Sequence, residues 1–213
     1  MHVGILGSGD VGKALARGFL SRGHSVTIGS REPAKLAEFV REHPEKLAAK
    51  TFADTAREGE IVVIATLFSG TQSALQLAGA QNFAGKIVID ATNPLKFEPG
   101  KPPALSVSGT DSAGESVQRW LPDAKVVKAF NTVGNALFVD PHFPGGKPTM
   151  FVAGNDDGAK NRVAQIAESF GWDVVDAGAI TSSRYLEAIA MLWIDYAIRT
   201  ATWQHAFKFL RKA

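Results

Sequence analysis

The stretch Val3-Gly4-Ile5-Leu6-Gly7-Ser8-Gly9-Asp10-Val11-Gly12 decides the fold expected for this chain. An apolar run suited to a short strand enters a turn with three glycines, and helical periodicity begins beyond the turn. The spacing Gly7-x-Gly9-x-x-Gly12 between a strand and a helix is the fingerprint of a dinucleotide-binding βαβ unit. Gly7 permits the tight turn, Gly9 lets the backbone approach a pyrophosphate, and Gly12 lets the helix pack closely on the strand. We therefore expect a dinucleotide at the helix N-terminus, with a purely structural turn as the alternative.

The end of the second expected strand indicates which dinucleotide binds. His24–Gly29 has a strand pattern and is followed by Ser30-Arg31. An NAD site usually carries Asp or Glu here, which bonds the ribose 2′-hydroxyl and would repel a 2′-phosphate. A hydroxyl and a guanidinium suit a phosphate instead, and Lys35 adds positive charge. We expect NADP(H) rather than NAD(H); the alternative is that Arg31 is only a solvated loop cation.

The composition is that of a globular protein. Of 213 residues, 45% are hydrophobic and 21% charged, which fits one domain or one domain with a smaller appendage. The formal net charge of +2 is too small to indicate a nucleic-acid or membrane partner. There is neither an apolar run of membrane-spanning length nor a signal-peptide pattern, so we expect a cytoplasmic protein.

Cysteine and histidine usage narrows the chemistry. The absence of cysteine excludes disulfides, thiolate metal sites and cysteine nucleophiles. The five histidines are scattered without ligand spacing, so we expect no metal site. No Gly-x-Ser-x-Gly elbow supports a serine hydrolase.

Strand and helix patterns alternate through the first two thirds of the chain. Glu60–Thr66 is apolar and β-branched, typical of a parallel strand buried on both faces. Further strands are expected at 48–52, 86–90 and 125–130, and helices at 53–58, 71–80 and 112–120. The proline-rich residues 96–110 predict a long loop, either a flap over the site or a tether. This alternation predicts an α/β fold, a Rossmann-type doubly wound and mostly parallel sheet, with residues 1–130 as the NADP(H)-binding domain.

The pattern restarts in the last third. Strands at 148–153 and 172–176 flank a helix at 156–170, and a helical pattern runs from Ser183 to about Leu210 with a break near Thr200. We expect residues 131–213 to form a small C-terminal α/β lobe with the acceptor cleft. The apolar stripe on the last helix is either core or the contact of a homodimer, or else Leu192 and Trp193 wall a flat-ring substrate.

Several later motifs combine with the glycine turn into an ordered set. They are Ile28-Gly29-Ser30-Arg31, Asp90-Ala91-Thr92-Asn93-Pro94, Val127-Lys128-Ala129-Phe130-Asn131, Asp176-Ala177-Gly178 and Ser183-Arg184-Tyr185-Leu186-Glu187. The set resembles the deazaflavin-dependent NADP oxidoreductase family over nearly the whole chain. That family includes the NADPH:8-hydroxy-5-deazaflavin (coenzyme F-420) oxidoreductases and the cytoplasmic oxidoreductase domain of the STEAP metalloreductases.

The resemblance implies a cleft in which a flavin or deazaflavin stacks on the nicotinamide of NADP(H). It places Ser8, Asp10, Val11, Ser30 and Arg31 at the pyrophosphate and adenosine phosphate. The nicotinamide ribose and ring are expected beside Thr66, Leu67, Phe68, Asn93, Pro94, Leu95, Ala129, Phe130 and Asn131. The expected acceptor residues are Thr132, Val133, Arg184 and Trp193.

Two of these positions have alternatives. Deazaflavin reductases tend to carry a histidine where this chain has Asn131, and the form Ala129-Phe130-Asn131 is similar to the metalloreductase domain. The acceptor therefore stays open among FMN, FAD and a deazaflavin of the coenzyme F-420 type. Arg184 either lies near that acceptor or pairs with Glu187 on a helix surface.

The function expected is that of an NADPH-dependent oxidoreductase that passes hydride to a flavin or deazaflavin. Such transfer needs little acid–base help, because the cofactors supply the reacting atoms. We therefore assign no certain catalytic residue, and Asn131 and Thr132 either orient the reacting groups or only cap a loop. One alternative is a dehydrogenase or reductase of a β-hydroxy acid or imine, for which the last helix offers only Lys208 and Lys212 as bases. Another is an NADP(H)-sensing protein without turnover.

Overall fold

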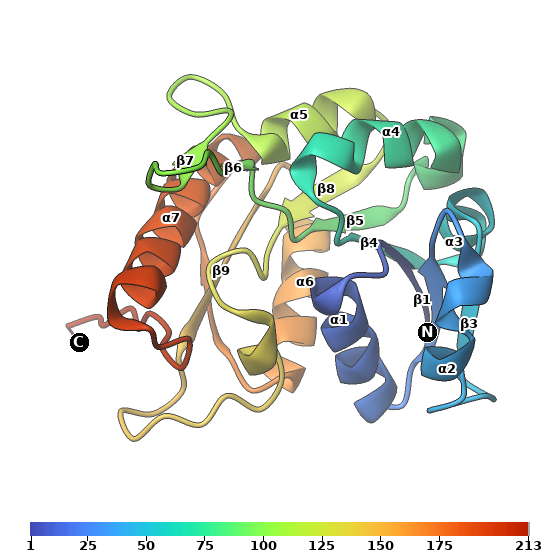
Figure 1. The fold of residues 1–213 in the computed structure, drawn as a ribbon, viewed down its shortest axis with the longest axis horizontal. Helices are drawn as coiled ribbons and strands as arrows, with labels where there is room; N and C mark the ends of the chain where they lie inside the picture. Colours follow the sequence, from blue (N-terminus) through green and yellow to red (C-terminus); the bar gives the residue numbers. More distant parts are fainter. Residues whose placement is uncertain (213) are drawn as a thin grey trace.

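The computed structural model describes residues 1–212 and contains an eight-stranded sheet (Figure 1). The glycine-rich stretch begins in an interior strand of this sheet. The strands are β1 (His2–Leu6), β2 (Ser25–Gly29), β3 (Leu47–Lys50), β4 (Ile61–Ile64), β5 (Ile87–Asp90), β8 (Lys125–Lys128), β9 (Thr149–Gly154) and β10 (Asp173–Asp176). Their order is β10-β9-β8-β5-β4-β1-β2-β3. All neighbours are parallel except β8 and β9. The expected Rossmann-type, mostly parallel sheet is confirmed.

Helices cover both faces of this sheet. They are α1 (Asp10–Ser21), α2 (Ala37–Val40), α3 (Phe52–Glu58), α4 (Phe68–Ala78), α5 (Ala113–Trp120), α6 (Asp157–Ser169) and α7 (Ser183–Thr200). Residues of α1 and α6 pack in one apolar cluster, and residues of α3, α4 and α5 pack in another. Neighbouring residues of β4 divide between them, since Val63 belongs to the first cluster and Val62 to the second. A strand with apolar residues on both faces is therefore buried from both sides.

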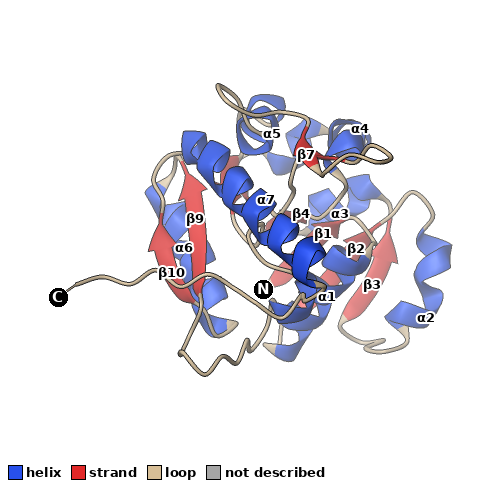
Figure 2. Cartoon of the chain, turned by 60° about the vertical axis from the view of Figure 1, so that its left-hand side comes forward, coloured by secondary structure: helices blue, strands red, loops and turns tan. Residues whose placement is uncertain are grey.

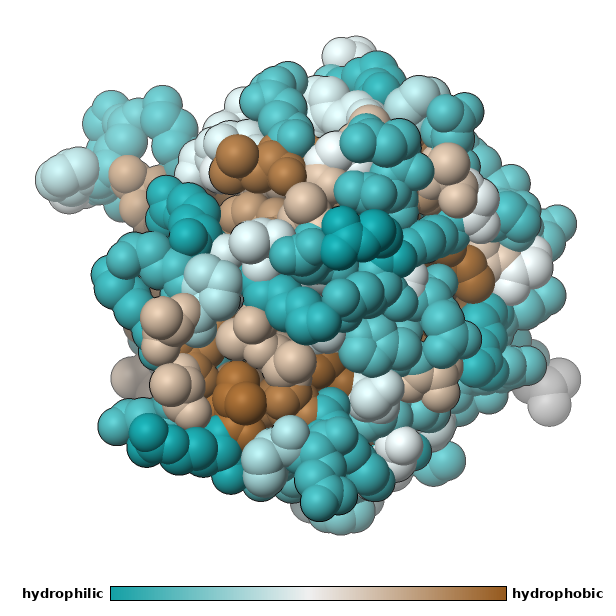
Figure 3. All heavy atoms as spheres, turned by 90° about the vertical axis from the view of Figure 1, so that its right-hand side faces the viewer, coloured by the Kyte–Doolittle hydropathy of each residue, from teal (hydrophilic) through white to brown (hydrophobic). Residues whose placement is uncertain are grey.

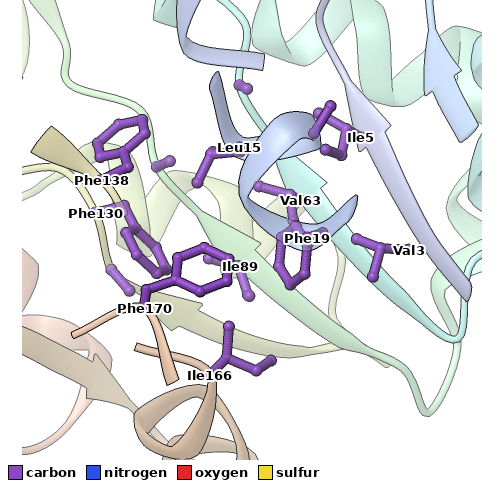
Figure 4. Packing of buried hydrophobic residues seen from close by; sticks show 14 of the residues in the cluster. Val3, Ile5, Leu15, Phe19, Val63, Ile89, Phe130, Phe138, Ile166 and Phe170 are labelled. Carbon is purple, nitrogen blue, oxygen red and sulfur yellow. The ribbon is translucent and has the colours of Figure 1, made fainter. Parts of the chain in front are cut away.

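The first cluster is rich in aromatic rings. Phe170 lies between Phe19 at 5.2 Å and Phe130 at 5.8 Å, measured between ring centroids. Figure 4 shows these rings with Leu15 and Ile89 around them. Because Phe130 directly precedes Asn131, this packing fixes the start of a predicted site loop. At the surface, the side of the molecule formed by α2 and α3 is mainly hydrophilic (Figure 3).

The last third of the chain extends the same sheet. The antiparallel pairing of Val127 with Gly154 and of Lys128 with Ala153 joins β8 to β9. Helix α7 packs on α5 and runs across the centre of the view in Figure 2. The division into domains at residues 130 and 131 stays a prediction.

Two segments differ from the sequence-based expectation. The last helix ends at Thr200, where Ala201 takes a left-handed conformation with φ of 53°, so Lys208 and Lys212 lie in the segment that follows and not on the helix. That segment folds back, because Trp193 Nε1 donates to the carbonyl of His205 at 2.8 Å. The proline-rich stretch contains a small hairpin of β6 (Leu95–Lys96) and β7 (Ala104–Leu105), whose two-residue strands are too short to leave a sequence pattern. No helix within residues 1–212 is long and apolar enough to cross a membrane.

Candidate functional site

The three glycines of the first turn have separate structural tasks. Gly7 has φ of 118°, and a Cβ on it would lie 2.4 Å from the carbonyl oxygen of Ala65. A Cβ on Gly12 would lie 2.0 Å from the carbonyl oxygen of Gly7, so helix α1 packs closely on the turn. Around Gly9, no atom of residues 1–212 beyond its chain neighbours lies within 4 Å of the Cβ position. Gly9 therefore faces open space at the N-terminus of α1, where a pyrophosphate is expected.

The end of β2 presents a hydroxyl and a guanidinium. Ser30 Oγ accepts a hydrogen bond from the backbone N–H of Glu32 at 3.1 Å. Arg31 is exposed and forms no ion pair with any residue that the structure describes. Lys35 pairs with Glu32 at 2.8 Å, so its charge is shared with a carboxylate. Of Arg31 and Lys35, Arg31 is thus the one whose positive charge is not paired with a carboxylate of residues 1–212.

The residues after β4 lie at the same carboxyl edge of the sheet. The hydroxyls of Thr66 and Thr71 are hydrogen-bonded at 2.8 Å. Leu67 is exposed. Phe68 begins α4, and its ring stacks on that of Trp120 with centroids 5.8 Å apart.

Two asparagines from the ends of β5 and β8 form a reciprocal pair. Asn93 Nδ2 donates to the backbone carbonyl of Asn131 at 2.8 Å, and Asn131 Nδ2 donates to Asn93 Oδ1 at 3.0 Å. Asn131 Nδ2 also donates to the carbonyl of Leu186 on α7 at 3.1 Å. We call these residues, Asn93, Asn131 and Leu186, the amide cluster. They unite two loops and α7 at the place where the nicotinamide is expected.

The amide cluster leaves one acceptor unused. Asn131 is 4% exposed, and its Oδ1 has no hydrogen-bond partner within residues 1–212. The amide cannot be turned over, because Oδ1 would then face the oxygens of Asn93 and Leu186. A buried polar atom without a partner costs about 1–3 kcal/mol. Oδ1 of Asn131 can therefore accept one further hydrogen bond, from an N–H or an O–H.

The residues expected at the acceptor are mostly buried by the chain itself. Thr132 and Val133 are buried beside the amide cluster. Trp193 is also buried, and its indole stacks on the ring of His205 with centroids 4.5 Å apart. The Trp193 indole also lies close to Gly134, where a Cβ would be 2.7 Å from it.

The alternative of an Arg184–Glu187 ion pair is wrong. Arg184 forms a bidentate ion pair with Glu115 on α5: Nε donates to Oε2 at 2.8 Å and Nη2 donates to Oε1 at 2.5 Å. This bond to Arg184 lowers the pKa of the Glu115 carboxyl. Glu187 points into the protein, is 1% exposed and binds Lys128 at 2.8 Å. Helix periodicity placed the two side chains near one another but did not show that they face different partners.

A buried group of charges was missed from the sequence. Lys128 forms ion pairs with Asp90 and Glu187, and none of the three is more than 1% exposed. Their signal was a lysine and an aspartate at the ends of otherwise apolar strands, because a charge in such a place needs a partner.

Comparison with known proteins relates these features to a family. The sequence model described as "NADP oxidoreductase coenzyme F420-dependent" matches residues 2–94. An F420-dependent NADP reductase of Methanocaldococcus jannaschii is 32% identical, and the alignment covers 93% of each chain. Metalloreductase STEAP3 of Rattus norvegicus is 33% identical over 89% of this chain, which spans only 36% of that relative's length.

Solved structures agree in fold. The crystal structure of an Arthrobacter sp. FB24 protein, named as a candidate F420-dependent NADP reductase, superposes with a TM-score of 0.93 at 43% identity. That superposition covers 98% of this chain and 99% of the other. An imine reductase of Aspergillus terreus has a TM-score of 0.68 at 18% identity, with 94% of this chain and 62% of the other covered, which shows a shared fold alone.

Proposed function

Because this chain belongs to the family of coenzyme F420-dependent NADP oxidoreductases, we propose that it transfers hydride between NADP(H) and a flavin or deazaflavin. That it is an NADP-dependent oxidoreductase follows from the family. The class of the acceptor is the further step. It is supported by the similarity to the Methanocaldococcus jannaschii reductase, which is named as F420-dependent.

The observation that carries the proposal is the unused acceptor of the amide cluster. A nicotinamide carboxamide offers an N–H to Asn131 Oδ1, a buried side-chain acceptor that has no partner within residues 1–212. At the other end, the glycine turn leaves room for the pyrophosphate and Arg31 offers charge to the 2′-phosphate. The residues present at the nicotinamide end and at the adenosine end thus fit NADP(H).

When bound, the reduced nicotinamide supplies the hydride, and the protein's contribution is placement. Asn131, whose Nδ2 is held by Asn93 and Leu186, would accept from the carboxamide N–H and so orient that group. Arg184 keeps its positive charge at the first turn of α7, held by Glu115. We propose that Thr132, Val133, Arg184 and Trp193 bound the acceptor cleft.

Stopped-flow mixing tests the proposal. NADPH is mixed with the protein and with FMN, FAD or a deazaflavin in turn, and nicotinamide absorbance is followed. Rapid loss of absorbance with one of these acceptors is expected. Tight NADPH binding without oxidation would instead identify a sensing protein. Oxidation only with an imine or keto acid would identify a small-molecule dehydrogenase.

A further inference from the structure

Three charged side chains are buried together behind the amide cluster. Lys128 Nζ lies 2.9 Å from Asp90 Oδ2, 2.8 Å from Glu187 Oε1 and 2.6 Å from the carbonyl oxygen of Thr92. We call Asp90, Lys128 and Glu187 the charged trio. The trio ties the ends of β5 and β8 to α7.

Every polar atom of the trio has a partner. Asp90 Oδ1 accepts from the backbone N–H and the hydroxyl of Thr92, at 3.0 and 2.7 Å. Glu187 accepts from the backbone N–H groups of Ala113 and Gly114, at 3.0 and 3.1 Å, in the first turn of α5. Burial alone would lower the pKa of Lys128, but the Asp90 and Glu187 carboxylates outweigh it and raise that pKa. The lysine is therefore a fixed cation, and no member of the trio is open to a substrate proton.

Buried charges seldom provide the most stable core. Apolar side chains of the same volume often stabilise a protein as well or better, because burying ions costs solvation energy. Charged hydrogen bonds are, however, directional, and they fix how separate elements sit relative to one another. The trio unites strand ends and a helix that lie far apart in the chain.

Each member of the trio is close in sequence to a member of the amide cluster. Lys128 and Asp90 fix both the carbonyl and the N–H of Thr92, the residue before Asn93. Glu187 follows Leu186, whose carbonyl accepts from Asn131. The trio thus fixes the positions of Asn93 and Leu186, the two residues to which the Asn131 side-chain amide donates.

We propose that Asp90, Lys128 and Glu187 are positioning residues that hold the amide cluster so that Asn131 Oδ1 meets the carboxamide of NADP(H). The inference rests on the proposed function only in taking NADP(H) as the ligand. It assigns the trio no contact with cofactor or acceptor. Its measurable consequence is selectivity for a carboxamide that donates an N–H.

The test compares the binding of NADPH with that of its 3-acetylpyridine analogue, whose methyl ketone cannot donate. Wild-type protein is expected to prefer NADPH by about fivefold or more, the scale of one neutral hydrogen bond. Asn131→Ala should abolish this preference. Glu187→Gln keeps the side-chain volume but accepts through one oxygen only, so it should also reduce the preference to near unity.

Two further variants separate positioning from simple loss of stability. Asp90→Asn, Lys128→Met and Glu187→Gln combined leave no buried charge at the trio, so this triple variant should fold yet still lack the preference. Glu42→Gln is the control: it breaks the exposed ion pair with Arg17 and should keep the wild-type preference for NADPH. Affinity for 2′-phospho-ADP-ribose, which lacks the nicotinamide, should stay within about twofold in every variant, since none of them changes the glycine turn, Ser30 or Arg31.

The inference is overturned if Glu187→Gln or the triple variant keeps the wild-type preference, or if the wild-type protein has none. Since every readout is binding, the result does not depend on an electron acceptor. A protein that shows the expected preference but reduces no flavin would refute the proposed function and leave the positioning role standing.

Discussion

At Phe130-Asn131, an unusual backbone conformation directly precedes an unused hydrogen-bond acceptor. The preceding Phe130 has φ of 61°, a left-handed conformation that bulky residues seldom adopt. Its ring packs against Phe138 and Phe170, with centroids 5.7 and 5.8 Å away, and this packing offsets the strain. The turn directs Asn131 inward to the amide cluster. Strain of this kind is often found at ligand sites.

At residue scale, Arg31 is predicted to decide between NADPH and NADH. Arg31→Ala should weaken NADPH binding by about 10- to 100-fold, the range for one charge-assisted hydrogen bond. NADH has no 2′-phosphate, so its binding should change little. Titration of both nucleotides against the variant measures this, with the exposed Arg41→Ala as the matched control. Equal losses for both nucleotides would show that Arg31 is only a surface cation.

At the scale of elements, the turn from β1 to α1 separates a folding role from a binding role. Gly7 and Gly12 hold the turn together by close backbone contacts, whereas Gly9 contacts little within the described chain. The sequence spacing assigned each glycine its task, and the close contacts of Gly7 and Gly12 agree with that assignment.

Alanine substitutions at two of these glycines should therefore differ. Gly12→Ala should destabilise the fold by about 1–3 kcal/mol or more, because its methyl would collide with the Gly7 carbonyl. Gly9→Ala should leave the unfolding temperature nearly unchanged but weaken NADPH binding by about tenfold or more, since the methyl enters the pyrophosphate space. Thermal unfolding and nucleotide titration of both variants test this. A Gly9→Ala protein that binds normally would move the pyrophosphate away from the turn.

A second element, the first turn of α7, is anchored by Arg184 and Glu115. Because the bond to Arg184 lowers the pKa of Glu115, the folded protein binds this proton less readily than the unfolded chain does. The stabilising contribution is thus complete above the ordinary value of 4.5 and is lost as the pH falls through the lowered pKa.

Glu115→Gln should accordingly be less stable than wild type at neutral pH, and the difference should shrink as the pH falls below about 4.5. Unfolding temperatures of both proteins across that range provide the measurement. The neighbouring Asp111–Arg119 pair is present in both proteins. A difference that stays constant with pH would contradict the anchoring role of the Glu115 charge.

At the scale of the whole molecule, one face of α7 remains apolar and exposed. Tyr185, Leu192 and Tyr196 share this face and are 71%, 60% and 42% exposed. The buried side of the helix carries Leu186, Ala190 and Trp193, so the apolar stripe predicted from the sequence divides between core and surface. Exposed apolar surface of this kind is typical of a subunit contact.

We predict a homodimer that uses this face. Leu192→Asp should shift the protein from dimer to monomer, because a charge would be buried in the contact without a partner. Light scattering coupled to size-exclusion chromatography measures the mass. Leu77→Asp on α4, at a leucine that is 58% exposed, is the matched control and should remain a dimer. A wild-type monomer at high concentration would refute the prediction.

Features that depend on local contacts could be predicted from the amino-acid sequence. The glycine turn, the alternation of strands and helices, and the basic corner after β2 each involve residues within a few positions of one another. Backbone geometry and apolar periodicity leave a readable pattern at such short range. The family resemblance, built on the same short motifs, is confirmed.

Contacts between residues that are distant in the chain are seen only in the folded structure. Asn93 and Asn131 are 38 positions apart, and Arg184 and Glu115 are 69 apart. Which partner a polar side chain meets depends on how the strands and helices pack, and no local spacing encodes that choice. The unused acceptor of Asn131 and the burial of Glu187 could be found only once the chain was folded, whereas a break near Thr200 was expected from the sequence and α7 ends there.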